Sequence, residues 1–349
     1  MAQWPGKAGT ILIALVAFLA GCAFDRTGPR PDAATGNGAA PWSDGGWYER
    51  SLRSGETTRW YRLYFPPGLE RGAPAVILLH GGSRSMRDMF GERAGGPRAW
   101  LDVADREGLV LVVPNGTNPE NGDTRGDNQF WVDATATGVA EDAPGTDDLR
   151  FITDLLDRIE RRYPVDPARV YVSGASNGGL LTYRLLIHEP RRFAAGAAFI
   201  ANLPADDADL RPPEAPTPLM ITNGTRDRLM QWDGGEIPMR GGRIRSTEDT
   251  VAWWLNANHA ADAPRRTRYL PDRAPDDDCR LREVTWRPES GGAPVRLLAM
   301  EGGGHTLPSL RYDLPDTFLA RRIFGNVCRD AEGATLAWEF MSPFRRDME

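Results

Sequence analysis

The sequence contains little cysteine, histidine and lysine. Among its 349 residues there are three cysteines and four histidines, and Lys7 is the single lysine, so every other basic residue is arginine. The cysteines and histidines are scattered along the chain, whereas a structural zinc site needs about four such ligands at close spacing. This composition argues against a structural zinc site.

Long runs of one charge sign are also missing. The net charge is −6, and arginine-rich stretches such as 264–268 alternate with acidic or apolar residues. Such alternation is typical of solvated helix faces, whereas a nucleic-acid-binding surface requires a basic patch. We therefore expect no nucleic-acid partner.

The apolar run near the N-terminus is too short for a permanent membrane-spanning helix, which needs about 20 apolar residues. Residues 10–21 form an apolar core that follows Lys7 and directly precedes Cys22. The four residues from Leu19 to Cys22 resemble a bacterial lipobox, where cleavage leaves a lipidated cysteine as the first residue. An ordinary secretory signal with cleavage nearby is the alternative. We interpret 1–22 as a lipoprotein signal peptide.

This interpretation predicts an exported protein. It would be lipid-anchored through Cys22 at the cell envelope, in the periplasm or at the cell surface, or secreted, with no other contact to a membrane. In an oxidising compartment Cys279 and Cys328 are expected to form one disulfide; the alternative is two unpaired buried thiols.

The rest of the chain divides into a linker and one domain. Residues 23–46 consist largely of Pro, Gly, Ala and Asp, a composition typical of a flexible tether. Residues 47–349 are numerous enough for one large domain with its own core, since 41% of the chain is hydrophobic. No internal repeat or second domain boundary is visible, and we expect a monomer.

Short apolar runs alternate with helical patterns along this domain. Strands are expected at 58–66, 75–80, 109–114, 169–174, 194–200, 218–224 and 295–301. Helices are expected at 147–163, with Asp147 or Asp148 as N-cap, at 178–190, and at 246–259, which opens on a capping pattern. This alternation predicts an α/β fold with a largely parallel, doubly wound sheet and helices on both faces.

One long segment, 115–147, lacks any periodicity. It follows a strand, so we expect it to project from the carboxyl edge of the sheet, where open α/β sheets bind ligands. Its aromatic residues are Phe130 and Trp131. They would either contact the substrate or anchor the loop to the core. Trp131 and the later Trp232 are therefore candidate substrate contacts, with packing as the alternative for each.

The stretch VYVSGASNGGLL, residues 170–181, contains the pattern G-x-S-x-G directly after an apolar run. In a glycine-rich chain this pattern needs support from its context. Here a strand pattern precedes it, small residues flank the serine, and a helical pattern follows, as a nucleophile elbow requires. The N-terminus of that helix would favour developing negative charge. The context therefore predicts Ser176 as a nucleophile.

The histidines are few enough to be sorted by position. In hydrolases with such an elbow, the acid and then the histidine follow the serine, each in a loop after a later strand. His80 precedes the serine, and His188 and His259 lie within or at the end of helical patterns. His305 alone stands just beyond a strand, after three glycines. We predict His305 as the general base.

The acid is predicted by the same order. Asp227 follows the strand at 218–224 by a three-residue turn, whereas Asp233 and Glu236 come later in the same loop and fit less well. An oxyanion hole also needs two backbone donors: the N–H after the nucleophile, here Asn177, and one from the loop after an early strand. The sequence LLHGG supplies the latter at Gly82, next to a structural His80.

These motifs resemble a known family. LLHGG, PNG, VYVSGASNGGLLTYRL, NGTRD and EGGGHTLP are similar to those of the secreted polyhydroxybutyrate depolymerase and feruloyl esterase group of carbohydrate esterases. The resemblance spans about residues 47–345. It implies an α/β-hydrolase fold, Ser176 as nucleophile, Asp227 as acid and His305 as base, with no metal or organic cofactor.

The resemblance also implies an ester substrate, which could be polymeric: feruloyl or other esters on plant polysaccharide, or short polyhydroxyalkanoate esters. The chain departs from the family pattern at Asn223, where His is common, and at Leu307, where Trp is common. An inactive hydrolase scaffold that binds a sugar or polymer is the alternative from another functional class. It predicts a degraded triad, whereas all three residues are present here.

Overall fold

The computed structural model describes residues 42, 44–91, 94–135, 146–207, 210–238, 240–312 and 318–348. The predicted signal peptide, Cys22 and most of the predicted tether lie outside these residues. Within the described residues the first strand is β1, which starts at Gly46, one residue before the predicted start of the domain. In the part of the chain so described, no helix is long and apolar enough to cross a membrane.

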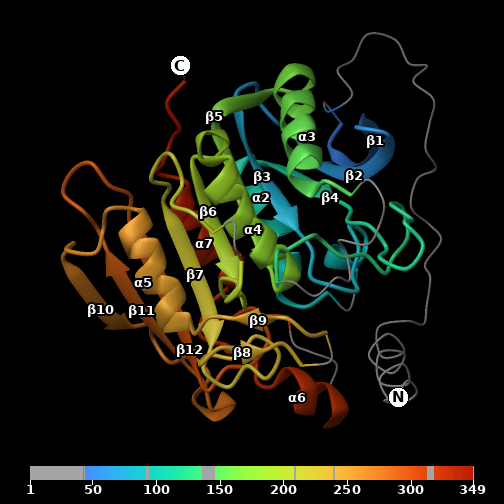
Figure 1. Ribbon diagram of the computed structural model, residues 1–349. Helices are drawn as coiled ribbons and strands as arrows, with labels where there is room; N and C mark the ends of the chain where they lie inside the picture. The colour runs from blue at the N-terminus through green and yellow to red at the C-terminus, as the bar shows by residue number, and fades with distance from the viewer. Residues whose placement is uncertain are drawn as a thin grey trace.

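One large sheet organises the domain (Figure 1). The ten strands of this sheet in the described residues follow the order β1–β2–β4–β3–β5–β6–β7–β12–β11–β10. They are β1 (Gly46–Ser54), β2 (Thr57–Phe65), β3 (Ala73–Leu79), β4 (Val110–Pro114), β5 (Val165–Ala175), β6 (Ala195–Phe199), β7 (Leu219–Gly224), β10 (Arg265–Tyr269), β11 (Arg280–Trp286) and β12 (Val295–Glu301). The six central strands, from β4 to β12, pair in parallel, and the outer strands pair antiparallel.

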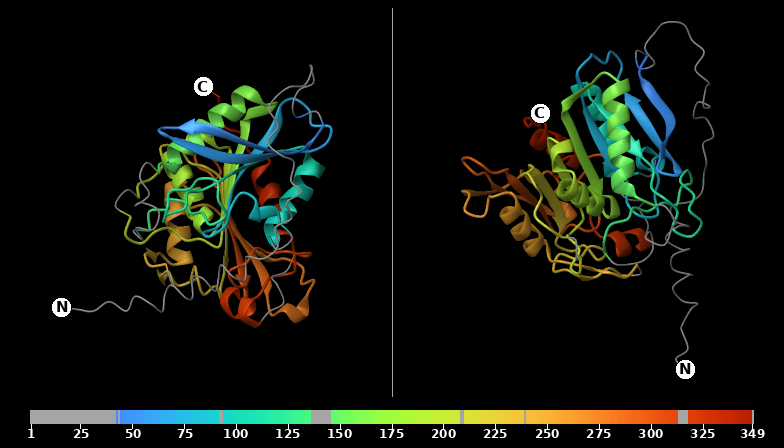
Figure 2. Two further views of the ribbon diagram at one scale, coloured as in Figure 1. Left: turned by 90° about the vertical axis from the view of Figure 1, so that its right-hand side faces the viewer. Right: turned by 45° about the horizontal axis from the view of Figure 1, so that its top comes forward.

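Helices cover both faces of the sheet (Figure 2). They are α2 (Ala99–Glu107), α3 (Asp148–Arg162), α4 (Asn177–His188), α5 (Thr247–Ala257), α6 (Phe318–Phe324) and α7 (Gly333–Met341). Side chains of β3 alternate between two cores: Ile77 and Leu79 pack with α3, α4 and α5, whereas Val76 and Leu78 pack with α2 and α7. The predicted largely parallel, doubly wound sheet with helices on both faces is thus confirmed.

Side chains at the helix starts determine where two helices begin. Asp147 is the N-cap of α3, because its carboxylate accepts a hydrogen bond of 2.9 Å from the N–H of Arg150. Ser246 accepts one of the same length from the N–H of Asp249 and caps α5, as its capping pattern predicts. Of the two cap residues left open for α3, the structure selects Asp147.

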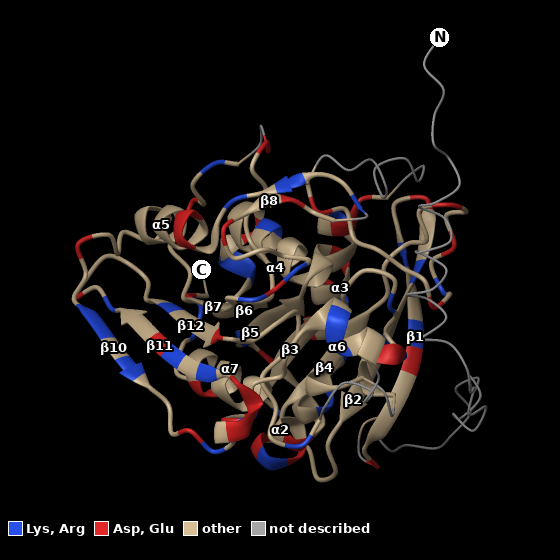
Figure 3. Cartoon of the chain, turned by 90° about the horizontal axis from the view of Figure 1, so that it is seen from below, with Lys and Arg blue, Asp and Glu red and all other residues tan. Residues whose placement is uncertain are grey.

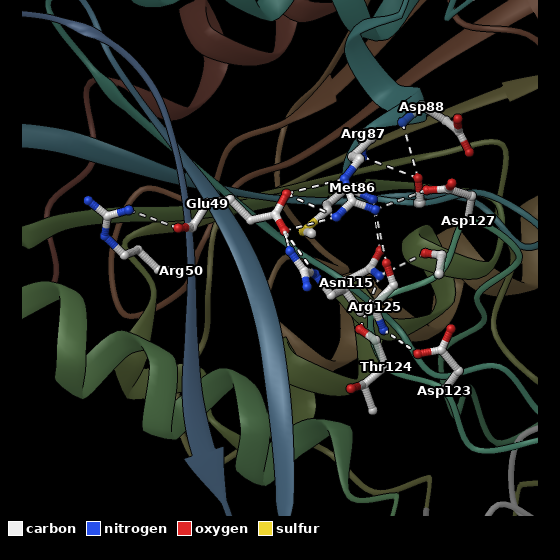
Figure 4. Close-up of polar contacts among 12 residues, drawn as sticks. Glu49, Arg50, Met86, Arg87, Asp88, Asn115, Asp123, Thr124, Arg125 and Asp127 are labelled. Atoms are coloured by element: carbon white, nitrogen blue, oxygen red, sulfur yellow. Dashed lines mark hydrogen bonds and ion pairs between the residues drawn. The ribbon is translucent and has the colours of Figure 1, made fainter. Parts of the chain in front are cut away.

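The long loop after β4 is ordered by polar side chains (Figure 4). The Asn115 side chain accepts a hydrogen bond from Met86 N and donates to the carbonyl oxygens of Thr124 and Gly126, at 2.9 to 3.1 Å. Arg125 also forms an ion pair with Glu49 on β1, at 3.1 Å. These contacts order the loop although its sequence has no periodic pattern of apolar residues. Residues 136–145 of the loop lie outside the described part of the chain.

The edge strand β10 is rich in arginine. All five residues of β10 are exposed, among them Arg265, Arg266 and Arg268, and β10 carries the blue colour of basic residues in Figure 3. Positively charged side chains on an edge strand oppose pairing with a strand of another molecule. This edge is therefore protected against further strand addition.

Candidate active site

The predicted catalytic and oxyanion-hole residues lie at one edge of the sheet. They follow the strands β3, β5, β7 and β12, which belong to the parallel set. The carboxyl ends of parallel strands meet at the same edge, so residues distant in sequence converge there. In Figure 1 the arrowheads of β6 and β7 point toward the lower side of the molecule, which faces the viewer in Figure 3.

Ser176 occupies a sharp turn between β5 and α4. Its backbone has φ 57° and ψ −122°, a conformation that costs a side-chain-bearing residue about 1–3 kcal/mol. The turn is possible because Gly178 lacks a side chain: a Cβ atom there would lie 2.3 Å from the carbonyl oxygen of Leu79 and 2.5 Å from that of His80. This is the geometry of a nucleophile elbow.

Asp227 and His305 form a short hydrogen bond. His305 Nδ1 lies 2.8 Å from Asp227 Oδ2, and the two side chains are 8% and 0% exposed. A carboxylate only accepts, so Nδ1 carries the hydrogen and Nε2 keeps its lone pair. The other carboxylate oxygen, Oδ1, accepts hydrogen bonds from the N–H groups of Leu229 and Met230, at 2.8 and 2.9 Å. Both members of the pair are thereby fixed in orientation.

The loops that carry this pair are bonded to each other. Arg226 N donates to Gly303 O at 2.9 Å, and Gly302 N donates to the Thr225 hydroxyl at the same distance. The loops approach so closely that a Cβ atom on Gly224 would lie 2.5 Å from the carbonyl oxygens of Gly303 and Gly304. Close packing of glycine-rich turns sets the spacing between acid and base.

A disulfide lies directly beneath the histidine loop. The structure joins Cys279, before β11, to Cys328, before α7. A Cβ atom on Gly303 would be 3.1 Å and 3.2 Å from the two sulfur atoms. His305 N also donates to Phe324 O at 2.6 Å. The cross-link therefore ties together the segments against which the His305 loop packs.

The glycines after β3 lie beside the elbow. A Cβ atom on Gly81 would be 3.6 Å from Cβ of Ser176, and one on Gly82 would be 3.6 Å from Cβ of Asn177. The first helical hydrogen bond of α4 runs from Leu180 N to Ser176 O. The N–H of Asn177 therefore forms no hydrogen bond within the helix. The loop after β3 and the N-terminus of α4, which carry the two predicted oxyanion donors, are therefore adjacent.

His80 is a buried, neutral side chain. Its Nδ1 lies 2.8 Å from Gly81 O, and its Nε2 accepts a hydrogen bond of 3.0 Å from Gly116 N. Burial lowers the pKa of His80 to about 4, because the charged imidazolium would lose its hydration. His80 thus connects the loop after β3 to the loop after β4, in keeping with the structural role predicted for it.

The other histidines lie away from the Asp227–His305 pair. His188 is the last residue of α4. His259 is exposed just after α5, with Nδ1 3.3 Å from Gly291 O. Between Ser176 and His305, both in the described part of the chain, the structure contains no hydrogen bond. Catalytic hydrogen bonds are often long in ligand-free enzymes and shorten when substrate binds.

The two candidate tryptophans differ in their surroundings. Trp131 is 0% exposed, and its indole N–H donates to His80 O at 2.9 Å; of its two alternatives, burial favours anchoring of the loop. Trp232 is partly buried and packs against the core beneath α5. Its role as a substrate contact stays a prediction.

Residues that the motifs did not reveal lie next to the elbow. Asp133 and Arg240 form an ion pair of 2.7 Å with side chains 2% and 14% exposed. The Asp133 carboxylate also accepts a hydrogen bond of 2.6 Å from the Asn177 side chain. In the sequence the contact is indicated by no more than an acid two residues after Trp131, because the basic partner of Asp133 lies in a different loop.

The two departures from the family pattern occupy packed positions. Asn223, at the end of β7, is 1% exposed and donates to the Asn202 side chain at 2.7 Å and to the Thr247 hydroxyl at 3.0 Å. Leu307 is 9% exposed, and a Cβ atom on Gly96 would be 2.7 Å from its Cβ. Both residues therefore shape the walls around the site rather than the acid–base pair.

The described residues contain no group of three or more His, Cys, Asp or Glu side chains that could hold a metal ion. The site is instead built from one serine, one acid–histidine pair and backbone N–H groups. This combination is suited to attack on a carbonyl carbon, with stabilisation of the resulting negative charge.

Comparison with known proteins identifies the family. The chain matches the family described as "Putative esterase" over residues 54–268. It is 32% identical over 269 residues to "Putative esterase NocK" of Nocardia uniformis subsp. tsuyamanensis, which covers 72% of this chain and 71% of that protein. The family match favours an enzyme over the alternative of an inactive binding protein.

More distant relatives are larger proteins. The chain is 25% identical to the bifunctional acetylxylan esterase/xylanase XynS20E of Neocallimastix patriciarum, covering 74% of this chain but 32% of that protein. It is 24% identical to feruloyl esterase B of Piromyces equi, covering 69% of this chain and 41% of that protein. The chain thus spans less than half the length of these two relatives.

The fold has a solved counterpart. The structure of an acetyl xylan esterase from Aspergillus awamori matches 80% of this chain and 99% of its own, with a TM-score of 0.50 and 15% sequence identity. This similarity concerns the fold, whereas the family rests on the sequence matches. The chain belongs to this esterase family and is a carboxylic ester hydrolase with an α/β-hydrolase fold.

Proposed function

We propose that the protein is a serine esterase in which Ser176, His305 and Asp227 form a catalytic triad. The observation that carries this proposal is the 2.8 Å hydrogen bond between His305 Nδ1 and Asp227 Oδ2. It leaves Nε2 as the only free base of the imidazole, at the sheet edge where Ser176 stands on its strained turn. A serine becomes nucleophilic when such a base takes its proton.

The proposed reaction has two steps. Nε2 of His305 takes the hydroxyl proton as Ser176 Oγ attacks the ester carbonyl, and Asp227 stabilises the imidazolium that forms. The N–H groups of Asn177 and Gly82 bind the oxyanion; each donor of this kind contributes roughly 10²- to 10³-fold in rate. Collapse of the tetrahedral intermediate transfers the proton to the leaving alcohol and gives an acyl-enzyme. Water, activated by the same imidazole, then releases the acid.

For the substrate we propose carboxylic esters on polysaccharide, with a feruloyl or acetyl acid part. Support comes from the relatives named as acetylxylan and feruloyl esterases, which align with 74% and 69% of this chain. A short polyhydroxyalkanoate ester is the second candidate. A poly(3-hydroxybutyrate) depolymerase of Ralstonia pickettii is 32% identical, over 52% of the chain.

We also propose that the enzyme is exported and held at the cell envelope by a lipid on Cys22. The support is the apolar run and lipobox-like sequence at the N-terminus. Mass spectrometry of the N-terminal peptide from the membrane fraction tests this proposal. A diacylglycerol-modified Cys22 is expected; an unmodified N-terminus in the soluble fraction would overturn it.

The triad is tested by initial rates with p-nitrophenyl acetate, methyl ferulate and a hydroxybutyrate oligomer. Ser176→Ala and His305→Ala are expected to abolish turnover of all three, while the matched variant Ser51→Ala, at the far side of the sheet on β1, keeps it. A fluorophosphonate probe should label Ser176 in the wild type and fail to label Ser176→Ala. Full turnover by Ser176→Ala would overturn the mechanism.

The same rates decide between the substrates. Preferential turnover of methyl ferulate would support an acyl pocket built for an aromatic acid. Preference for the oligomer would support the depolymerase alternative. Turnover limited to p-nitrophenyl acetate would support the triad and an acetyl acid part, and it would argue against the feruloyl and hydroxyalkanoate substrates.

A further inference from the structure

One four-residue segment, Phe130–Asp133, contacts both backbone positions assigned to the oxyanion hole. On the side of β3, a Cβ atom on Gly82 would lie 2.8 Å from the Phe130 ring. Trp131 donates from its indole N–H to His80 O at 2.9 Å, and the two rings are 4.7 Å apart. The loop carrying the first donor is therefore packed against this segment.

On the side of the elbow, the segment binds the side chain of Asn177. The amide oxygen of Asn177 accepts from Trp131 N at 2.7 Å, and its nitrogen donates to Trp131 O at 2.9 Å and to an Asp133 carboxylate oxygen at 2.6 Å. The residue is 1% exposed. These three hydrogen bonds fix the side chain whose own backbone N–H is the second donor.

Asp133 is the centre of this arrangement. One carboxylate oxygen, Oδ2, contacts both Asn177 and Arg240, at 2.6 and 2.7 Å. The other, Oδ1, accepts from the N–H and the hydroxyl of Thr135, at 3.2 and 2.7 Å. A buried carboxylate that accepts from donors on both oxygens has a defined position, and a charge-assisted bond holds its partner more firmly than a neutral one.

Arg240 neutralises Asp133 from another loop. It lies between the short strands β8 (Gly235–Glu236) and β9 (Arg243–Ile244), and its guanidinium is 5.4 Å from the centre of the Phe130 ring. This arginine therefore contacts both ends of the segment. Buried ion pairs contribute little net stability, so the fold alone gives no strong reason for this pair.

Further contacts hold the middle of the segment. Val132 N donates to Asp148 Oδ2 at 2.8 Å, and Val132 O accepts from Arg184 of α4 at 2.7 Å. Asp148 in turn pairs with Arg59 of β2 at 2.7 Å, with both side chains almost completely buried. The segment is thus fixed to the sheet and to the same helix that begins at the elbow.

We propose that Asp133, paired with Arg240, is a positioning residue of the oxyanion hole. It holds the Asn177 side chain, and through it the angle at which the backbone N–H of Asn177 meets the developing oxyanion. The inference deepens the proposed function and rests on it. Asp133 acts through Asn177 and does not itself touch the substrate.

Three variants test this role. Asn177→Ala keeps the backbone N–H but removes all three side-chain hydrogen bonds, and Asp133→Asn keeps the shape but removes the charge. Glu283→Gln is the matched control, because Glu283 on β11 is also a buried carboxylate, paired with Arg268 and Arg296, and lies away from the site. Circular dichroism and thermal unfolding establish that each variant is folded.

Two quantities are measured for each full-length variant: kcat and KM on p-nitrophenyl acetate, and the inhibition constant of a trifluoromethyl ketone. The ketone adds to Ser176 and places an oxyanion in the hole. Displacing a donor is expected to lower kcat of Asn177→Ala by about tenfold to a hundredfold, with KM changed by less than about threefold. The inhibition constant of Asn177→Ala should rise in parallel. The kcat and the inhibition constant of Asp133→Asn should lie between those of Asn177→Ala and the wild type, and those of Glu283→Gln should match the wild type.

The inhibition constant separates positioning from simple loss of structure. A partly unfolded preparation has fewer active molecules, which lowers kcat but leaves the inhibition constant of the folded molecules unchanged. If both Asn177→Ala and Asp133→Asn keep the wild-type inhibition constant, the positioning role is wrong. A failure of the proposed function is distinguishable, because the wild type itself would then neither turn over the ester nor bind the ketone.

Discussion

The buried histidine beside the elbow makes the stability of the fold depend on pH. His80 is 1% exposed and its pKa is lowered from 6.5 to about 4 by burial. Its Nε2 accepts a hydrogen bond from Gly116 N, which a protonated imidazole cannot do. Protonation of the folded protein at this position would therefore break a contact between the loops after β3 and β4.

The sign of the effect follows from the two pKa values. The unfolded chain binds a proton at His80 as the pH falls through about 6.5, whereas the folded chain resists protonation until the pH reaches about 4. Between these values the unfolded state holds more protons, so acidification favours unfolding. The contribution of His80 to stability is fully present above about pH 6.5 and is lost progressively toward pH 4. At about 1.4 kcal/mol per pKa unit, the loss from this one residue is about 3 kcal/mol.

The assay is urea unfolding followed by circular dichroism between pH 7.5 and pH 4, for the wild type and for His80→Gln. Glutamine can accept from Gly116 N but does not titrate, so it removes the proton uptake. Carboxylates and the other histidines titrate in both proteins and cancel in the comparison. The wild type is expected to lose about 3 kcal/mol more than His80→Gln over this range. The variant His259→Gln, which changes an exposed histidine, should follow the wild type.

Parallel curves for the wild type and His80→Gln would refute this reasoning. They would mean that His80 takes up a proton equally in both states, so that the ring is accessible to water. A steeper curve for the variant would refute it as well, since it would reverse the sign.

Three further predictions concern the loops of the site. Asp227→Asn should leave the fold intact and reduce kcat on p-nitrophenyl acetate by roughly 10³- to 10⁴-fold, because an amide no longer fixes the tautomer of His305; a loss below tenfold would contradict the assigned acid. Gly178→Ala should destabilise the protein by about 1–3 kcal/mol in thermal unfolding, because a Cβ atom would lie 2.3 Å from Leu79 O. An unchanged unfolding temperature would contradict the tight turn. Reduction of the disulfide, which closes a loop with a sequence separation of 49, should cost about 4 kcal/mol in urea unfolding; equal stability with and without dithiothreitol would contradict its contribution.

The positions of the predicted catalytic residues could be derived from the sequence because they depend on topology alone. Strands 75–80, 169–174, 218–224 and 295–301 were recognisable as short apolar runs. Each corresponds to a parallel strand, so whatever follows each strand meets at one edge. Neither the register nor the side-chain contacts are needed for that conclusion.

Three of the four outer strands, β1, β10 and β11, were not predicted, whereas β2 corresponds to the strand expected at 58–66. β10 has the sequence RRTRY and is exposed at every position, so it carries no apolar alternation by which a strand could be recognised. β1, GWYERSLRS, is only partly buried over most of its length. Such strands are stabilised by hydrogen bonds to a neighbour, and the neighbour is not visible in their own sequence. Helix α7 was also not predicted, although its buried residues Ala334, Ala337, Trp338 and Met341 recur at helical spacing.

The contacts of the long loop were beyond the sequence for a similar reason. Its order comes from side-chain amides and carboxylates that bind backbone groups, such as Asn115 with Thr124 O and Asp123 with Arg125 N. A polar composition of this kind is equally compatible with a disordered segment. An ordered loop differs from a disordered segment in that each polar group has a specific partner. Those partners are known only from the folded structure.

Two buried ion pairs connect the long loop after β4 to the active site. Asp148 pairs with Arg59 on β2 and accepts a hydrogen bond from Val132 N of the segment 130–133. Asp133, within that segment, pairs with Arg240 in the loop after β8 and accepts a hydrogen bond from Asn177. A buried pair contributes little net stability, but loss of one partner is costly because it leaves an unpaired charge. The geometry of the elbow therefore depends on ion pairs that add little to the stability of the fold when intact. Loss of one partner would nevertheless lower that stability. Substitution of one partner of either pair should therefore lower the unfolding temperature as well as turnover, because the remaining partner is left buried and unpaired.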